Sequence, residues 1–116
     1  MMKKKKRSPV GQAVHVVVDR PLGSVHPKHK DLVYRVNYGY VPGILGGDGE
    51  EQDVYILGVE EPLVTFDGVV IAVLHREDDD EEKWVVAPLG TEISDEEILS
   101  RTRFVEQYFK TTLKRN

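Results

Sequence analysis

Three carboxylates in a glycine-rich stretch have the spacing of a group that could bind a cation. Asp48, Glu50 and Asp53 lie on a predicted turn that leads into a strand. Alternation along the chain directs Asp48 and Glu50 to similar sides, and Asp53 begins the rigid element. Carboxylate oxygens suit Mg²⁺, Mn²⁺ or Ca²⁺ rather than soft metals, although the ligand spacing is not that of an EF-hand. An acidic hairpin loop in water is the alternative interpretation.

A run of six acids at residues 77–82 is the second candidate. Neighbouring carboxylates repel one another and need cations or water to coexist, and such a run is usually a solvated turn. Here the run connects two apolar segments, so both of its ends are anchored. Lys83 follows it directly at the start of a predicted strand, where it could face the same cavity. Together, the two acidic clusters would let two or three metal ions share a site.

Aromatic hydroxyl groups mark a third segment, residues 34–40. Tyr34, Tyr38 and Tyr40 lie there together with Asn37. Phenols hydrogen-bond to anionic oxygens, whereas an aromatic core strand is the alternative interpretation. Acids that hold divalent metals, beside lysine, arginine and tyrosine side chains that hold an anion, form the arrangement that phosphoryl transfer needs.

Short strands must position these side chains. Stretches rich in β-branched, aromatic or alternating residues are separated by glycine, proline and charged turns. These stretches are residues 13–18, 32–40, 53–59, 69–74 and 84–87. The last segment changes to a helical period, because Ser94 and Glu97 form a capping box ahead of an apolar stripe. The stripe consists of Ile98, Val105, Phe109 and Leu113. The sequence predicts a mainly β, or α+β, fold: a small five-stranded OB-like β-barrel with a C-terminal α-helix.

Charge and length set limits on domain number and on function. The 116 residues suit one domain, residues 10–116, behind a basic tail, residues 1–9, that we expect to be disordered. Residues 1–7 carry five positive charges, so the remainder holds 11 basic against 20 acidic side chains. Such an acidic body argues against a general nucleic-acid binder, although a barrel that binds nucleic acid through its basic arm stays as a hypothesis.

Composition also excludes several classes of protein. The chain contains no cysteine, which excludes disulfide scaffolds, thiol catalysis and iron–sulfur clusters. No apolar run approaches the roughly 20 residues that span a bilayer, and no apolar leader follows the basic cluster. We therefore expect a cytoplasmic protein without membrane association.

Several of these stretches, in this order, resemble the soluble inorganic pyrophosphatases of family I. The stretch Asn37-Tyr38-Gly39-Tyr40 followed by residues 48–54 is similar to that family's Asn-Tyr-Gly-Tyr segment and its Asp-x-Asp-Pro-x-Asp-Val signature. Residues 83–88 resemble the family's lysine strand, and residues 104–108 resemble its tyrosine-containing terminal helix. The resemblance extends over residues 13–113.

The resemblance implies an inorganic diphosphatase that uses Mg²⁺, or alternatively Mn²⁺, to hydrolyse pyrophosphate to two phosphates. The metal ligands that it implies are Asp48, Asp53, Asp78 and Glu81. It implies that Glu50 prepares the attacking water together with Asp53, and that Lys83 acts at the site. The substrate-binding residues that it implies are Tyr34, Tyr38, Lys83 and Tyr108. Members often form hexamers, which leaves a homo-oligomer open for this chain.

The chain also departs from the family's pattern. Glu50 replaces a shorter aspartate, the family's Lys-x-Glu pair aligns with His15 and Val17, and Phe109 replaces a lysine. The family's phosphate-binding arginine has no counterpart residue for residue. The basic side chains in that stretch are His26, Lys28 and Lys30. These departures motivate a second hypothesis, a catalytically degenerate member that binds phosphate, a nucleotide or a protein partner.

Overall fold

The computed structural model of the chain describes residues 8–78 and 81–116. Most of the predicted basic tail, residues 1–7, lies outside the described residues. No helix in the described part of the chain has the length and apolar character needed to cross a membrane.

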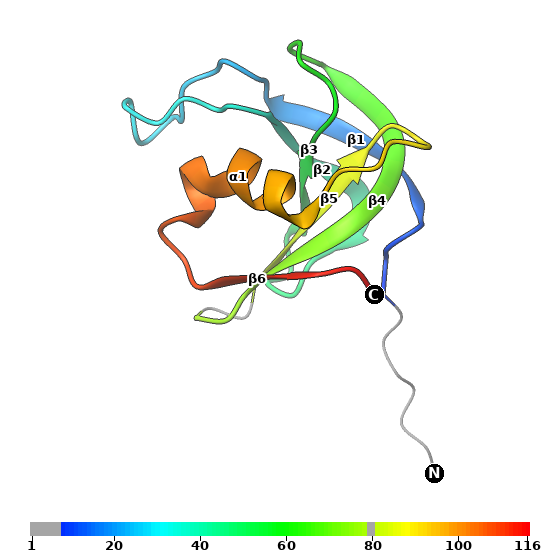
Figure 1. The fold of residues 1–116 in the computed structure, drawn as a ribbon. Coiled ribbons are helices and arrows are strands. Elements are labelled where there is room, and N and C mark those ends of the chain that lie inside the picture. Colours follow the sequence, from blue (N-terminus) through cyan, green and yellow to red (C-terminus); the bar gives the residue numbers. More distant parts are fainter. Residues whose placement is uncertain (1–7, 79–80) are drawn as a thin grey trace.

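Within the described residues, the chain forms a closed β-barrel with one helix across its side (Figure 1). The elements are β1 (Ala13–Arg20), β2 (Asn37–Leu45), β3 (Glu51–Ile56), β4 (Thr65–Arg76), β5 (Glu81–Ala87), α1 (Asp95–Glu106) and β6 (Thr111–Lys114). The strand order is β1-β2-β3-β5-β4-β6, and an additional pairing of β1 with β4 closes the barrel. Strands β3 and β5 pair in parallel, whereas the other neighbours are antiparallel. The predicted five-stranded barrel with a C-terminal helix is confirmed, and β6 is added to it.

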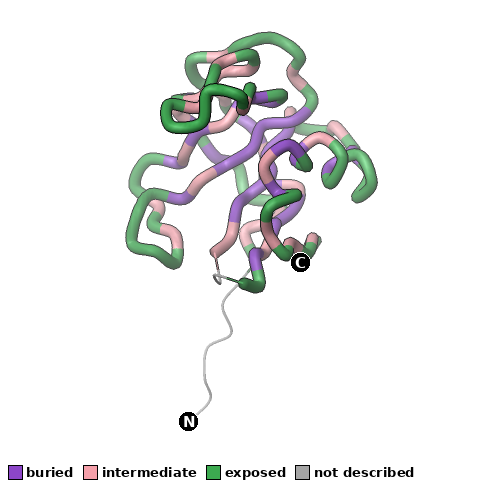
Figure 2. The backbone as a smooth tube through the Cα atoms, turned by 90° about the vertical axis from the view of Figure 1, so that its left-hand side faces the viewer, coloured by how far each residue is buried: buried purple, intermediate pink, exposed green. Residues whose placement is uncertain are grey.

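Alternating side chains on the strands form two hydrophobic clusters. On β3, Val54 and Ile56 belong to the cluster inside the barrel, to which all five barrel strands contribute. Tyr55 belongs to the second cluster, on the outer face of the sheet, where Ile98 and Phe104 of α1 pack against it. Figure 2 shows the buried residues along the central stretches of the chain and most of the exposed residues at the periphery. A residue on the outer face of β3 or β5 therefore points toward α1 rather than into the barrel.

The predicted start of the helix is confirmed, but its predicted end is wrong. The hydroxyl of Ser94 accepts a hydrogen bond from the backbone N–H of Glu97 at 3.1 Å, as the capping box requires. The helix ends at Glu106, so Phe109 lies in the following turn. Leu113 lies on β6, where it pairs with Leu74 of β4. The apolar spacing continues through residue 113, but pairing with the edge of β4 gives the last residues a hydrogen-bonded strand instead.

A glycine allows β1 and β2 to approach closely. A Cβ atom at Gly39 would lie 2.0 Å from the carbonyl oxygen of Val17. The neighbouring backbone would have to shift, so we expect Gly39→Ala to lower the free energy of unfolding by about 3 kcal/mol. Urea denaturation measures this change. Gly47→Ala is the matched control, because a Cβ there meets nothing within 4 Å. Equal stability of the two variants would contradict this account of the strand crossing.

Candidate functional site

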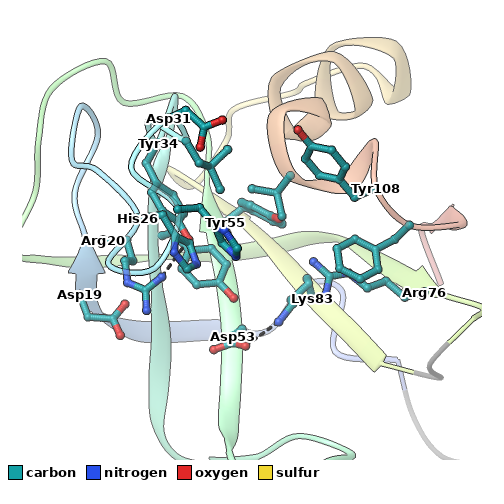
Figure 3. Close-up of a pocket in the computed structure, with 15 residues that line it drawn as sticks. Asp19, Arg20, His26, Asp31, Tyr34, Asp53, Tyr55, Arg76, Lys83 and Tyr108 are labelled. Atoms are coloured by element: carbon teal, nitrogen blue, oxygen red, sulfur yellow. Dashed lines mark hydrogen bonds and ion pairs between the residues drawn. The ribbon is translucent and has the colours of Figure 1, made fainter.

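A pocket of about 670 Å³ opens between the outer face of the barrel, the segment before β2 and the end of α1. The side chains in it come from strands β1 to β5, from the segment between β1 and β2, and from the end of α1 and the turn after it (Figure 3). Of the residues predicted from the sequence, the pocket brings together Tyr34, Tyr38, Asp53, Lys83 and Tyr108.

An ion pair between neighbouring strands lies at the centre of this pocket. The Nζ atom of Lys83 donates a hydrogen bond to Oδ2 of Asp53 at 2.6 Å, and it also contacts the carboxylate of Glu81. Lys83 is buried, whereas the side chain of Asp53 is 33% exposed and remains accessible from the pocket. Burial opposes the charge of Lys83, but Tyr38, Asp53 and Glu81 outweigh it and raise the pKa of Lys83 above its ordinary value. Lys83 is therefore a fixed positive charge beside an accessible carboxylate.

Two tyrosines adjoin the ion pair. The ring centroid of Tyr38 lies 5.7 Å from the Nζ atom of Lys83 and 5.1 Å from the ring of Tyr55. Burial raises the pKa of Tyr38, so its phenol stays protonated and can donate a hydrogen bond to an anionic oxygen. Tyr34 is buried, and its hydroxyl accepts a hydrogen bond from Nη1 of Arg20 at 2.9 Å.

Tyr108 lines the pocket from the turn after α1. In Figure 3 it lies across the cavity from Asp19 and Arg20, and its side chain is largely exposed. This position allows the phenol to reach a ligand from the side opposite β1.

Four of the predicted carboxylates lie outside the residues that line the pocket. Asp48 and Glu50 are in the exposed turn between β2 and β3, where Oδ1 of Asp48 accepts the backbone N–H of Glu50 at 3.0 Å. Oδ1 of Asp78 accepts the backbone N–H of Lys110 at 3.3 Å. Glu81 adjoins the pocket through its contact with Lys83. The roles of these four acids in metal binding or catalysis stay predictions.

The donor set of the pocket fits a hard divalent cation. Asp19 lines the pocket together with Asp53, and both offer only oxygen ligands. Burial raises the pKa of Asp19, the charge of Asp53 raises it further, and Arg20 opposes both effects. Within residues 8–78 and 81–116, no three histidine or acidic side chains form a ready metal site. Mg²⁺ fits this arrangement, because it usually keeps several waters and binds one or two carboxylates together with substrate phosphates.

A buried charged cluster contributes Arg76 and Tyr55 to the lining of the pocket. Arg76 donates to both carboxylate oxygens of Glu106, at 3.1 and 2.6 Å. The hydroxyls of Tyr55 and Thr111 donate to the same carboxylate at 2.6 and 2.7 Å. The guanidinium of Arg76 also lies 3.7 Å from the ring centroid of Phe109, and its Nη1 atom is 3.6 Å from Glu81. The cluster thus joins the end of α1 and β6 to the acid that contacts Lys83.

Sequence reasoning missed several residues of this site. Arg20 and Asp19 looked like the polar end of a strand before Pro21, and the only local signal was a charged pair after an apolar run. Arg76 and Glu106 are 30 residues apart in the chain, and no local pattern links them. Arg20, Arg76 and Glu106 each end a strand or helix as a charged residue, and that position was the available hint.

Three comparisons relate the chain to known proteins. Residues 5–115 match the inorganic pyrophosphatase family. An inorganic pyrophosphatase of Aeropyrum pernix is 36% identical in an alignment of 81 positions that covers 66% of this chain. The matched stretch spans 43% of that relative's length.

Two solved structures have a similar fold. The inorganic pyrophosphatase from Ehrlichia chaffeensis superposes with a TM-score of 0.71 at 16% identity, covering 93% of this chain and 88% of that one. The inorganic pyrophosphatase from Neisseria gonorrhoeae gives a TM-score of 0.63 at 25% identity, covering 84% of this chain and 74% of that one.

Proposed function

This chain belongs to the inorganic pyrophosphatase family, and we propose that it hydrolyses pyrophosphate to two phosphates with the aid of a divalent metal ion. The observation that carries the proposal is the pair formed by Asp53 and Lys83 at 2.6 Å, in a pocket that also contains Tyr34 and Tyr38. The carboxylate is accessible to a cation, and the lysine and the phenols are suited to phosphoryl oxygens. The degenerate binding protein, the alternative hypothesis, is not favoured by the family match.

The metal that we propose is Mg²⁺, with Mn²⁺ as the alternative. Its principal proposed ligand is Asp53. When bound, such an ion neutralises phosphate charge and activates the attacking water. Asp48, Asp78 and Glu81 are the further ligands proposed from the family's pattern, and Glu50 is the proposed base. A cytoplasmic location and a homo-oligomer also stay predictions.

The remaining side chains of the pocket act on the substrate. Lys83 keeps its positive charge throughout, so it attracts and orients a phosphoryl group without exchanging a proton. The phenol of Tyr38 donates a hydrogen bond to a phosphoryl oxygen, since burial keeps it protonated. Tyr108 approaches from the turn after α1 and hydrogen-bonds to the opposite end of the substrate.

Release of orthophosphate from pyrophosphate, from ATP and from p-nitrophenyl phosphate tests this proposal. In the presence of Mg²⁺, we expect fast release from pyrophosphate and slow release from the other two compounds. Release from pyrophosphate at the rate of the buffer alone would overturn the proposal. Binding of pyrophosphate without turnover would instead support the degenerate binding protein.

A further inference from the structure

The pocket contains one arginine, Arg20, whose guanidinium has no carboxylate within ion-pair distance among the described residues. Arg76 is paired with Glu106, and Lys83 is paired with Asp53 and Glu81. In the part of the chain that the structure describes, Arg20 forms no ion pair, and its side-chain partner is the neutral phenol of Tyr34. The charge of the neighbouring Asp19 acts on Arg20, but the hydrogen bond goes to the phenol, so the remaining donors can bind an incoming anion.

An irregularity in β1 directs this arginine into the pocket. The register pairs Val18 with Gly39 but Arg20 with Tyr38, so β1 has one extra residue at that point. Such a bulge re-aims the side chains that follow it. Tyr38 in turn pairs with Tyr55 on β3. The bulge therefore places Arg20 in a row with Tyr38 and Tyr55, on the face of the sheet that forms the pocket.

The contact with Tyr34 holds the guanidinium in place and leaves donors free. Only Nη1 is bonded to the hydroxyl of Tyr34, at 2.9 Å, and a guanidinium has five N–H donors. Figure 3 shows Arg20 and Lys83 on opposite sides of Asp53 within the pocket. An anion above Asp53 would lie between the two positive charges.

We propose that Arg20, positioned by the hydroxyl of Tyr34, binds a phosphoryl group of the substrate and takes the place of the phosphate-binding arginine that the sequence lacks elsewhere. This inference rests on the proposed function for the identity of the substrate. It concerns the binding of a diphosphate anion, which can be measured without turnover.

The other basic residues of the same loop fit this role less well. Lys28 and Lys30 are exposed and do not line the pocket. His26 does line it, but burial and the charges of Arg20, His29 and Lys28 lower the pKa of its ring. His26 is thus largely neutral near pH 7, whereas an arginine remains charged.

Calorimetric binding of imidodiphosphate, a non-hydrolysable diphosphate, in the presence of Mg²⁺ tests the inference. We expect Arg20→Ala to weaken binding roughly 10- to 100-fold and to raise KM for pyrophosphate more than it lowers kcat. Arg20→Lys should recover part of the affinity, because it keeps the charge but not the planar donor set. Tyr34→Phe should show a smaller loss. Arg35→Ala is the matched control, since Arg35 is exposed and lies outside the pocket.

The outcomes separate this inference from the proposed function. Equal affinity of wild type and Arg20→Ala, both folded by circular dichroism, would overturn the role of Arg20. Absence of imidodiphosphate binding by the wild type would overturn it as well. Loss of binding in Arg20→Ala supports it even if the wild type fails to hydrolyse pyrophosphate, in which case only the proposed function falls.

Discussion

Replacing Asp53 by asparagine is expected to reduce kcat/KM for pyrophosphate by about a hundredfold or more. Asparagine keeps the shape of the side chain but removes the charge that would attract a divalent cation into the pocket. It also removes the carboxylate that bonds to Lys83 at 2.6 Å, which leaves Lys83 with Glu81 alone. The substitution acts on both the metal and the lysine, and for this reason we expect the largest loss of activity at this position. Steady-state phosphate release measures it.

Asp67→Asn is the matched control for this experiment. Asp67 pairs with His15 at 2.7 Å on an exposed part of the sheet, outside the pocket. The control should keep the activity of the wild type, because it makes the same chemical change away from the site. Activity of Asp53→Asn within about threefold of that control would show that Asp53 does not act in the reaction.

Replacing Glu106 by alanine is expected to lower the free energy of unfolding by about 3–5 kcal/mol. The carboxylate of Glu106 accepts hydrogen bonds from Arg76, Tyr55 and Thr111. Its removal leaves the buried guanidinium with only the longer ion pair to Glu81, at 3.6 Å. The free energy of unfolding of a native protein is only about 5–15 kcal/mol, so this loss is a large share of the stability. Urea denaturation measures the change. Glu96→Ala, at an exposed position of the same helix, is the control and should alter the free energy of unfolding by less than about 1 kcal/mol. Equal effects of the two substitutions would contradict the stabilising role of the buried carboxylate.

The same carboxylate predicts how stability changes in acid. Burial raises the pKa of Glu106, but hydrogen bonds from Arg76, Tyr55 and Thr111 outweigh burial and lower the pKa below the ordinary value of 4.5. The unfolded chain therefore takes up the proton first, so the stabilisation is present above that pH and disappears as the pH falls through the folded pKa. We expect the melting temperature of the wild type to fall more steeply below pH 4.5 than that of Glu106→Gln. If the melting temperatures of the two proteins fell in parallel with pH, Glu106 would not be a source of the acid sensitivity.

Local patterns were sufficient to predict most of the elements but not the contacts between them. The β-branched residues of 13–18 and the apolar run 69–74 predicted β1 and β4, and the capping box predicted the start of α1. The end of α1 was mispredicted, because the spacing of Phe109 and Leu113 suits a helix as well as a strand. Pairing with β4, which the local sequence does not encode, favours the strand.

The site residues also fall into those that the sequence predicted and those that it did not. Asp53, Lys83 and Tyr38 were predicted to act together, and they meet because β2, β3 and β5 are neighbours in the sheet. Asp48 lies in a turn, as predicted, but its side chain accepts a hydrogen bond from the backbone of Glu50 and does not line the pocket. Arg20 was missed because a one-residue bulge changes which face it occupies, and a sequence pattern of period two cannot reveal a bulge.

Metal-dependent hydrolysis is tested most simply by measuring phosphate release from pyrophosphate during a titration with Mg²⁺. The titration starts from buffer that a chelator has freed of divalent metal ions. We expect the wild type to have no activity without the metal and its rate to rise to saturation as Mg²⁺ is added. Asp53→Asn should stay near the background rate at every concentration. A rate in the wild type that does not change with Mg²⁺, or that matches the background throughout, would contradict the claim that this pocket hydrolyses pyrophosphate with a divalent metal ion.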